Sequence, residues 1–569
     1  MCLPFFRLGT GVGLLFCLAI AQAQVAPTTP GDTDLIRNRQ DRLLEEQQKR
    51  LQDLKDLPGA PATPEAPPTP DEGRCFTIQH IELQGADHLS AAERARLTQP
   101  YEGQCVGVTQ LNALLKAITD TYIGRGYVTS RAYLPQQDLS QGTLTILVVE
   151  GKLESIKPAE GSGLTPREVE RAFPGDPGKL LNLRELEQLV DQLNRLPSNQ
   201  VQLDLVPGQE VGGSVVQLKN TPSKPWRASL SRNNNGQAST GEQQWGLGFE
   251  WDNPLGLADQ LMLRGGHDGV SDSHQLSKNG YLAYSLPWGW WTFDYNYSQS
   301  RYRSQAESNG FAFEQSGQSE SQQFKAERVV HRDSVSKTAL SSGLSLLHTD
   351  NYIEDSRLAV SSNRITELQL GFNHGRRFGS AFVNLDLGWQ RGIGAFAAQG
   401  DLTHGPGQPT ARYRKYTATL SYLQSFQLLG ENFSVSSLAT GQRSDDVLYS
   451  PQRLSLGGLS SIRGFKDQSL SGDSGGYWRN DLRWTRGVTW AWLQPLFSQY
   501  GAGLGYDQGV IHGGRYNPEV RGRLSSKSLE LFARGRYLSA SVTFAQSLER
   551  PAALPEREHP VYFSVDLFL

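Results

Sequence analysis

The stretch "VNLDLGW", residues 383–389, alternates strictly between apolar side chains and polar or small ones. Its odd positions, from Val383 to Trp389, are apolar, and the positions between them hold Asn, Asp and Gly. Successive side chains of a strand point to opposite faces, so this segment has one apolar and one polar face. "WTFDYNY" (291–297) and "VYFSVDLFL" (561–569) repeat the alternation. The pattern is typical of a transmembrane β-barrel, with apolar side chains toward lipid and polar ones toward the lumen.

The barrel pattern covers the C-terminal part of the chain, from Trp226 to Leu569, with turns rich in Gly, Asn, Asp and Ser. These 344 residues divide into 16 segments of about 21 residues, each with room for a strand of roughly ten residues and its connection. We therefore predict a mainly β fold with an antiparallel barrel over 223–569, in which an even number of strands near 16 would enclose water. A soluble β-sandwich shares the alternation but fits this length poorly.

The N-terminus predicts export from the cytoplasm. Arg7, the apolar run 11–21 and the sequence Ala-Gln-Ala at 21–23 indicate a signal peptide over residues 1–23. Later segments offer no run of about 18 apolar residues, which a spanning helix would need. The net charge of −3 and the pI near 6.4 point to no nucleic-acid partner.

Two of the four cysteines remain after removal of the signal peptide, Cys75 and Cys105. An even pair in an oxidising compartment predicts a disulfide. Closing this loop would stabilise the fold by about 3 kcal/mol.

Residues 24–57 contain a long run of helix-forming residues, with Asp32 or Thr33 as the expected N-cap. The helix is too polar for a dry core and suits a water-filled site. A solvated or coiled-coil helix is the alternative interpretation. The proline-rich segment 58–73 follows and is predicted to be a linker.

Two further segments, 74–152 and 153–222, each read as strand, helix, helix, strand, strand. The repeated βααββ order indicates an internal duplication. Small modules of this kind present a sheet edge that suits capture of an extended chain by strand addition. Two inert spacer domains are the alternative interpretation.

The stretch "LGGLSSIRGFKDQSLSGDSGG" (456–476) contains two possible functional motifs. Its end, Gly-Asp-Ser-Gly-Gly at 472–476, matches the nucleophile segment of trypsin-like proteases, but no histidine of the chain has the sequence context that such a triad needs. We interpret these five residues as a turn and the protein as no enzyme. The middle of the stretch comprises Ile462, Arg463, Gly464 and Phe465.

An arginine inside a barrel lumen needs an anionic partner, and "GAGLGYDQG" (501–509) offers Asp507. Alternation turns Asp507, Gly503 and Gly505 inward, and inward glycines leave room for a loop to pack against the wall. We predict an ion pair between Arg463 and Asp507 that pins the loop and keeps the channel competent. Simple barrel stabilisation is the alternative role, and Phe465 is expected to pack the loop tip.

Four segments resemble, in the correct order, the two-partner secretion transporters of the TpsB family. They are 126–156 and 193–208, similar to the periplasmic POTRA domains of that family, 240–261, similar to its first barrel strands, and 455–465, similar to its pore loop. The C-terminal Leu569 departs from the family, which usually ends in an aromatic residue.

The resemblance implies a 16-stranded outer-membrane barrel with two periplasmic POTRA domains and a helix that plugs the lumen. Such a pore recognises one large β-helical exoprotein (the TpsA type: a haemolysin, an adhesin or a contact-dependent inhibition toxin) through its POTRA domains and translocates it unfolded, without ATP. The resemblance also implies a monomer in outer-membrane lipid, inserted by the barrel assembly machinery. The chain shows neither a phosphate-binding loop nor a cluster with metal-ligand spacing, so we expect no cofactor and no metal. A barrel assembly factor of the same superfamily is the alternative function.

Overall fold

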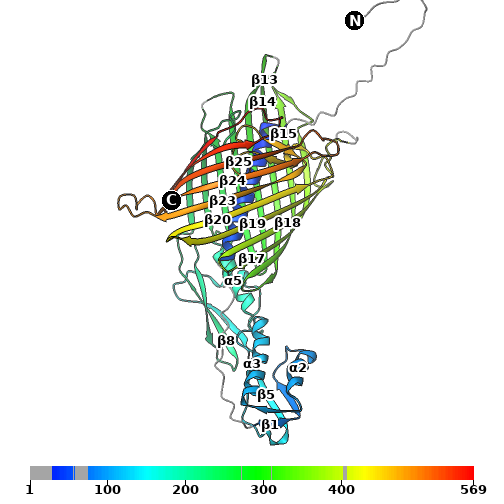
Figure 1. Ribbon diagram of the computed structural model, residues 1–569, viewed down its shortest axis with the longest axis vertical. Helices are drawn as coiled ribbons and strands as arrows, with labels where there is room; N and C mark the ends of the chain where they lie inside the picture. The colour runs from blue at the N-terminus through cyan, green and yellow to red at the C-terminus, as the bar shows by residue number, and fades with distance from the viewer. Residues whose placement is uncertain (1–27, 56, 58–74, 271, 309, 402–406) are drawn as a thin grey trace, which may run out of the picture.

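The computed structural model describes residues 28–55, 57, 75–270, 272–308, 310–401 and 407–569 (Figure 1). The predicted signal peptide, 1–23, and the predicted linker, 58–73, lie outside these residues. No helix within the described ranges is both long and apolar enough to cross a membrane.

The C-terminal part forms a closed antiparallel barrel, in which the last strand pairs with the first (Figure 1). Sixteen long strands build it, and the two-residue strand β16 (Ser356–Arg357) is appended to β15. In chain order they are β9 (Trp226–Asn233), β10 (Gln244–Asp252), β11 (Gln260–Asp268), β12 (Leu276–Trp288), β13 (Trp291–Ser308), β14 (Phe311–Arg332), β15 (Ser336–Ile353), β17 (Asn363–Phe378), β18 (Ala381–Ile393), β19 (Arg414–Leu428), β20 (Glu431–Arg443), β23 (Ser474–Gly487), β24 (Gln499–His512), β25 (Gly522–Arg534), β26 (Leu538–Glu549) and β27 (Val561–Phe568). The predicted 16-stranded barrel is confirmed.

The alternation in β18 shows how the sequence sets the two faces of the wall. Asn384 is buried and hydrogen-bonded to the helix inside the lumen, whereas Leu387 on the opposite face is exposed on the outside of the barrel. In β27, Tyr562 is likewise buried on the lumen side, and Val561 and Leu567 are exposed. An apolar outer face suits lipid, and a polar inner face suits water and polar chains.

The N-terminal part of the chain holds the two predicted βααββ modules, and both are confirmed. The first contains β1 (Cys75–Ile78), β2 (His80–Gln84), α2 (Ala91–Thr98), η1 (Gln99–Tyr101), β3 (Gln104–Gly107), α3 (Val108–Gly124), β4 (Arg131–Tyr133), η2 (Leu139–Gln141) and β5 (Thr143–Val149). The second contains β6 (Lys152–Pro158), α4 (Pro166–Ala172), α5 (Leu183–Asn194), β7 (Val201–Pro207) and β8 (Gly213–Asn220). Each module has its own apolar core beneath a three-stranded sheet, ordered β2-β5-β4 and β6-β8-β7.

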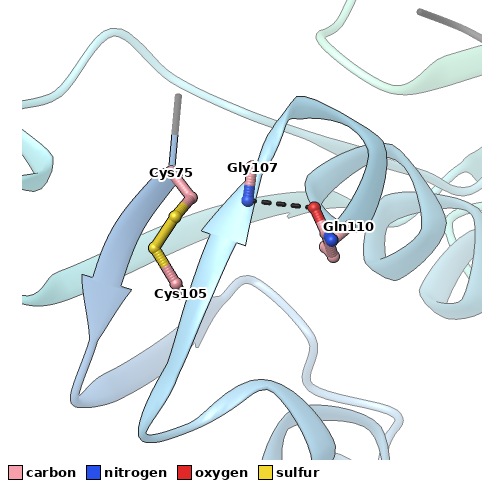
Figure 2. Close-up of a disulfide and its surroundings, with 4 residues drawn as sticks. All are labelled: Cys75, Cys105, Gly107 and Gln110. Carbon is pink, nitrogen blue, oxygen red and sulfur yellow. Dashed lines mark hydrogen bonds between the residues drawn. A yellow bond between two sulfur atoms is a disulfide. The ribbon is translucent and has the colours of Figure 1, made fainter. Parts of the chain in front are cut away.

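The first module departs from the sequence prediction at its first strand. The expected single strand breaks at Gln79, because the N–H groups of Gln79 and His80 both donate to the carbonyl oxygen of Gly142, at 2.7 and 3.2 Å. The segment before the break, β1, pairs with β3 instead of the main sheet. Figure 2 shows the disulfide between Cys75 and Cys105, which joins these two strands with a Cα–Cα distance of 5.3 Å.

A helix, α1 (Pro30–Lys55), runs through the inside of the barrel (Figure 1). It begins earlier than the sequence predicted, because Thr29 caps it. The backbone N–H of Asp32 donates to Thr29 Oγ1 at 3.1 Å, and the N–H of Thr29 donates back to Asp32 Oδ2 at 3.3 Å. Asp32 therefore lies at the third helical position and completes a capping box.

Candidate functional site

The pore loop, residues 454–472, connects β20 to β23 and folds back into the barrel. Its base is a short hairpin of β21 (Leu454–Leu456) and β22 (Leu470–Gly472), entered through the short helix η3 (Ser450–Gln452). At its tip Ile462 and Phe465 are fully buried in an apolar cluster on the lumen side of the wall. The cluster also contains Leu438, Leu456, Leu470, Tyr477, Ile511, Leu524 and Leu554. Phe465 therefore packs the loop tip.

The structure brings Arg463 and Asp507 together. Arg463 Nε donates to Asp507 Oδ2 at 2.8 Å, and Nη2 donates to Oδ1 at 2.5 Å, so the guanidinium grips the carboxylate with two parallel hydrogen bonds. The backbone N–H of Arg463 adds a third bond to Asp507 Oδ2, at 3.0 Å. Both residues are almost completely buried, with exposed fractions of 4% and 0%. Such a bidentate pair fixes the orientation of the loop as well as its position.

Sequence reasoning missed a second carboxylate at this site. Arg463 Nη1 donates to Asp481 Oδ1 of β23 at 2.5 Å. The carbonyl oxygen of Arg463 accepts a bond from the hydroxyl of Tyr562 at 3.0 Å, and Ser526 donates to Asp507 at 3.0 Å. Asp481 lies on the same face of β23 as the buried Tyr477, so its alternation signalled a lumen position but did not select it as a partner.

The glycines of the wall and of the loop differ in how close the opposing side chains approach them. A Cβ at Gly505 would lie 2.5 Å from Arg463 Nη2, so this position must lack a side chain for the arginine to fit. Gly464 on the loop is equally tight, since its Cβ would lie 2.6 Å from Cβ of Ser526. Gly503, predicted as a third contact of the loop, has Arg483 and Glu530 of the wall as its nearest neighbours instead, each at 3.3 Å.

Helix α1 is held on one wall by a group of polar side chains centred on Gln47. Gln47 Nε2 donates to Asp386 Oδ2 at 2.7 Å, and its Oε1 accepts from Asn384 at 3.1 Å and from Ser421 at 2.9 Å. Gln47 is almost fully buried. The contact is specific in geometry, but every partner is a group that water also hydrogen-bonds well.

Ion pairs extend this contact along the helix. Arg50 lies 2.9 Å from Glu327 and 3.6 Å from Asp386, and Lys325 lies 3.2 Å from Glu46. These pairs alternate in sign between helix and wall, so each charge has a counter-charge. Next to these pairs Leu51 and Leu54 of α1 pack against Phe382 of the wall, so the helix is held by charge pairing together with a small apolar contact.

The other half of α1 contacts the pore loop directly. Arg37 Nη2 donates to the carbonyl oxygen of Lys466 at 2.6 Å, and Gln40 Nε2 donates to the carbonyl oxygen of Ser455 at 2.6 Å. Ser460 donates to Asp41. The two elements inside the barrel are therefore in contact with each other as well as with the wall.

What remains open beside α1 is a cavity of about 670 Å³. It is lined by α1, by the wall and by α5 of the second module, including Gln188 and Asp191. Helix α5 is fixed at this end of the barrel, because Arg332 pairs with Asp191 and with Glu187, and Gln192 Nε2 donates to the carbonyl oxygen of Gly289 at 3.0 Å. The second module thus forms part of the wall of the pore.

Comparisons with known proteins identify this architecture. Residues 212–533 match the family described as haemolysin secretion/activation protein ShlB/FhaC/HecB. The chain belongs to this family. Residues 76–151 match the ShlB-type POTRA domain, and residues 152–207 match a second POTRA domain.

Curated outer-membrane transporters are similar to the chain over most of its length. It is 36% identical to the outer membrane transporter CdiB of Escherichia coli strain 536 over 555 residues, which covers 97% of this chain and 93% of CdiB. It is 33% identical to the hemolysin transporter protein ShlB of Serratia marcescens, covering 73% of each chain. The solved structure of CdiB from Escherichia coli superposes with a TM-score of 0.89 at 36% identity, covering 96% of this chain and 100% of that one.

Membership of the ShlB/FhaC/HecB family settles the class of function. The protein is an outer-membrane transporter of two-partner secretion, which exports a partner exoprotein, and it is not an enzyme. In the protease-like segment, Asp473 Oδ1 accepts the N–H of Leu448 at 3.0 Å and pairs with Arg453 at 3.3 Å. The expected turn over 472–476 is shorter than predicted, because Gly472 ends β22 and Ser474 begins β23, so only Asp473 lies between the two strands.

Proposed function

We propose that this transporter captures one large β-helical exoprotein through its POTRA domains and passes it unfolded through the lumen once α1 has moved aside. The observation that carries the proposal is the filling of the lumen. With α1 in place the cavity beside it is about 670 Å³, too small for a folded domain. A chain can pass only if the helix moves and the chain is extended.

The contacts of α1 support its movement. Many of them are hydrogen bonds and ion pairs, and water replaces such contacts at a small net cost. The apolar contact of Leu51 and Leu54 with Phe382 is small beside the cluster that holds the pore loop. The predicted proline-rich linker, 58–73, would keep the helix tethered after it leaves the lumen. No ATP is required in this scheme, and folding of the exoprotein outside the cell supplies the direction.

The first POTRA domain offers a site for the exported chain. Strand β4 is an edge of its sheet, and its residue Tyr133 is paired with Leu147 of β5; both side chains are exposed. An extended segment can add to such an edge through its backbone and place apolar side chains on these two residues. We propose that the transporter acts as a monomer in outer-membrane lipid after insertion by the barrel assembly machinery.

The pore loop has a gating role in this proposal, since it is pinned through Arg463 and Asp507 and holds part of α1. Its alternative role is stability of the barrel alone. The two roles differ in what a variant does at equal amounts of folded barrel: a gating residue changes secretion, and a purely structural residue changes only the unfolding temperature.

The experiment compares secretion of the exoprotein encoded beside this gene by the wild type and by Arg463→Ala, at matched barrel levels in the outer membrane. The control is Arg264→Ala, which removes a more exposed pair of α1 with the wall, Arg264–Glu45 at 2.9 Å. We expect the exoprotein in the medium for wild type and control, and in the periplasm for Arg463→Ala. Secretion that persists in cells lacking the transporter would contradict the proposed function.

A further inference from the structure

The barrel closes through a short pairing between its last and first strands. β27 and β9 pair over five residues, from Ser564–Asn233 to Phe568–Ser229, compared with eight for β9–β10 and seven for β26–β27. Beyond Ser564 the side chain of Asn234 takes over, accepting the N–H of Phe563 and donating to the carbonyl oxygen of Val561, both at 2.8 Å. We call this closure, β27 with β9 and Asn234, the seam.

Lys466, the residue after Phe465 in the pore loop, lies across the end of the seam away from the POTRA domains. Its ammonium group pairs with Glu242, in the turn between β9 and β10. Its backbone N–H donates to Glu558 Oε2 at 2.6 Å, in the segment between β26 and β27. The ammonium group also lies 5.4 Å from the ring centre of Tyr562 on β27. One residue of the loop therefore contacts both sides of the seam, and it is almost fully buried.

Glu558 holds the pore loop beside the seam. Its carboxylate accepts the consecutive N–H groups of Lys466, Asp467 and Gln468 at 2.6, 3.0 and 2.8 Å. Its own backbone is fixed by Ser547 of β26, since the N–H of Glu558 donates to Ser547 Oγ at 2.9 Å and the N–H of Ser547 donates to its carbonyl oxygen at 3.0 Å. A carboxylate with three backbone donors is a strong, directional anchor.

We propose that Lys466 is a positioning residue that holds the two sides of the seam together. The barrel then stays closed at the end away from the POTRA domains as long as the pore loop keeps its position. The pore loop adds contacts between the β9 side and the β27 side to the short, five-residue strand pairing. Withdrawal of the loop would break the ammonium contact with the β9 side and the amide contacts with the β26–β27 side together. This proposal concerns the barrel without a bound exoprotein and does not depend on which exoprotein is exported.

The plug helix is connected to the same point. Arg37 of α1 donates to the carbonyl oxygen of Lys466, so one residue joins the helix, the loop and the seam. Departure of α1 removes one of the bonds that hold Lys466 in place. The seam is therefore expected to be less firmly closed when the helix is out than when it is in.

The test is backbone hydrogen exchange of the purified full-length protein, wild type against Lys466→Gln. We expect exchange of β9 and β27, residues 229–233 and 564–568, to become on the order of tenfold faster, with β17 and β18 unchanged. Arg483→Gln is the matched control, because it breaks a wall pair with Glu530 of 2.8 Å away from the loop. In this control, backbone hydrogen exchange of β9 and β27 should stay at the wild-type rate.

Two further variants distinguish a local effect of the Lys466 contact on the seam from a general change in the stability of the barrel. Glu242→Gln removes the same ion pair from the other side and should give the same local change. The exchanged pair Lys466→Glu with Glu242→Lys restores opposite charges across the seam and should return exchange toward wild type. Unchanged seam exchange in both single variants, a uniform rise over the whole barrel, or failure of the exchanged pair to restore protection would each overturn the proposal.

Discussion

The pore loop and helix α1 share one lumen but are held there by different forces. The loop tip buries Ile462 and Phe465 in an apolar cluster and places Arg463 against two carboxylates with almost no exposure. Helix α1 contacts the wall through amides and ion pairs such as Gln47–Asp386 and Arg50–Glu327. A small apolar contact adds to these near its C-terminal end, where Leu51 and Leu54 pack against Phe382. Apolar burial and desolvated charge are lost only at high cost, whereas polar contacts in a wet lumen exchange with water.

The pore loop and α1 also differ in how they are attached to the barrel. The loop is covalently held at both ends by β20 and β23, and its anchor must survive each transport event. The helix is connected at one end only to the rest of the described fold, through the segment that follows Lys55.

The largest effect is expected for Asp507→Ala, which leaves Arg463 buried with one of its carboxylates missing. Removing one partner of a buried pair costs about 3–5 kcal/mol, so the barrel should unfold at a lower temperature and secretion should fall. Heat-dependent mobility of the purified barrel measures the first, and exoprotein in the medium the second. Adding Arg463→Leu should recover part of the thermal loss. A double variant less stable than Asp507→Ala would contradict the buried-charge explanation.

A matched pair of glycine variants tests how tightly the loop is seated. Gly505→Ala places a methyl group 2.5 Å from Arg463 Nη2 and should cost about 1–3 kcal/mol by displacing the loop. Gly503→Ala, in the same strand, meets only wall side chains at 3.3 Å and should be tolerated. Unfolding temperature and secretion are the measurements. Equal losses in both variants would mean that strand glycines matter for the barrel rather than for the loop.

A smaller effect is expected on the helix side of the comparison. Gln47→Ala leaves Asn384 and Ser421 without their partner, and loss of such bonds costs about 1–3 kcal/mol when the groups stay buried. Water can enter the lumen, so the lower end applies, and the helix should leave more often. Single-channel conductance in a planar bilayer should show more frequent openings, with secretion retained. Gln48→Ala, at the exposed neighbouring position, should behave as wild type.

The smallest effect is expected from salt. The Debye length falls from about 10 Å at 0.1 M to about 3 Å at 1 M, so salt weakens exposed pairs such as Arg264–Glu45 and leaves desolvated ones almost unchanged. Higher salt should raise the frequency of channel openings while the unfolding temperature stays constant. A parallel fall of the unfolding temperature would show that the two elements are held by the same kind of force.

Sequence reasoning predicted the architecture because alternation reports the environment of each side chain. Asn384 and Asp386 are polar between apolar neighbours, and both face the lumen. The partner of Arg463 was predictable because inward glycines and one inward aspartate occur together in 501–509. Both predictions use only the order of polar, apolar and small residues within one short segment.

Features that depend on two distant segments were not predictable. Asp481 alternates inward like several other residues of β23, and only the position of the loop selects it as a partner of Arg463. Glu558 lies in a connecting segment without any periodic pattern, and its role appears only when the loop turn lies beside it. Gly503 has the same alternation as Gly505 but lies too far along the strand to meet the loop.

The docking of α5 has a consequence for the delivery of the exported chain. Because α5 lines the same cavity as α1, a segment held on the second POTRA domain is already beside the entrance of the pore. Its capture by the pore is then an intramolecular event, with an effective concentration on the order of millimolar for a short connection. A weak hold on the exoprotein is sufficient at such concentrations, and a weak hold also lets the chain move on.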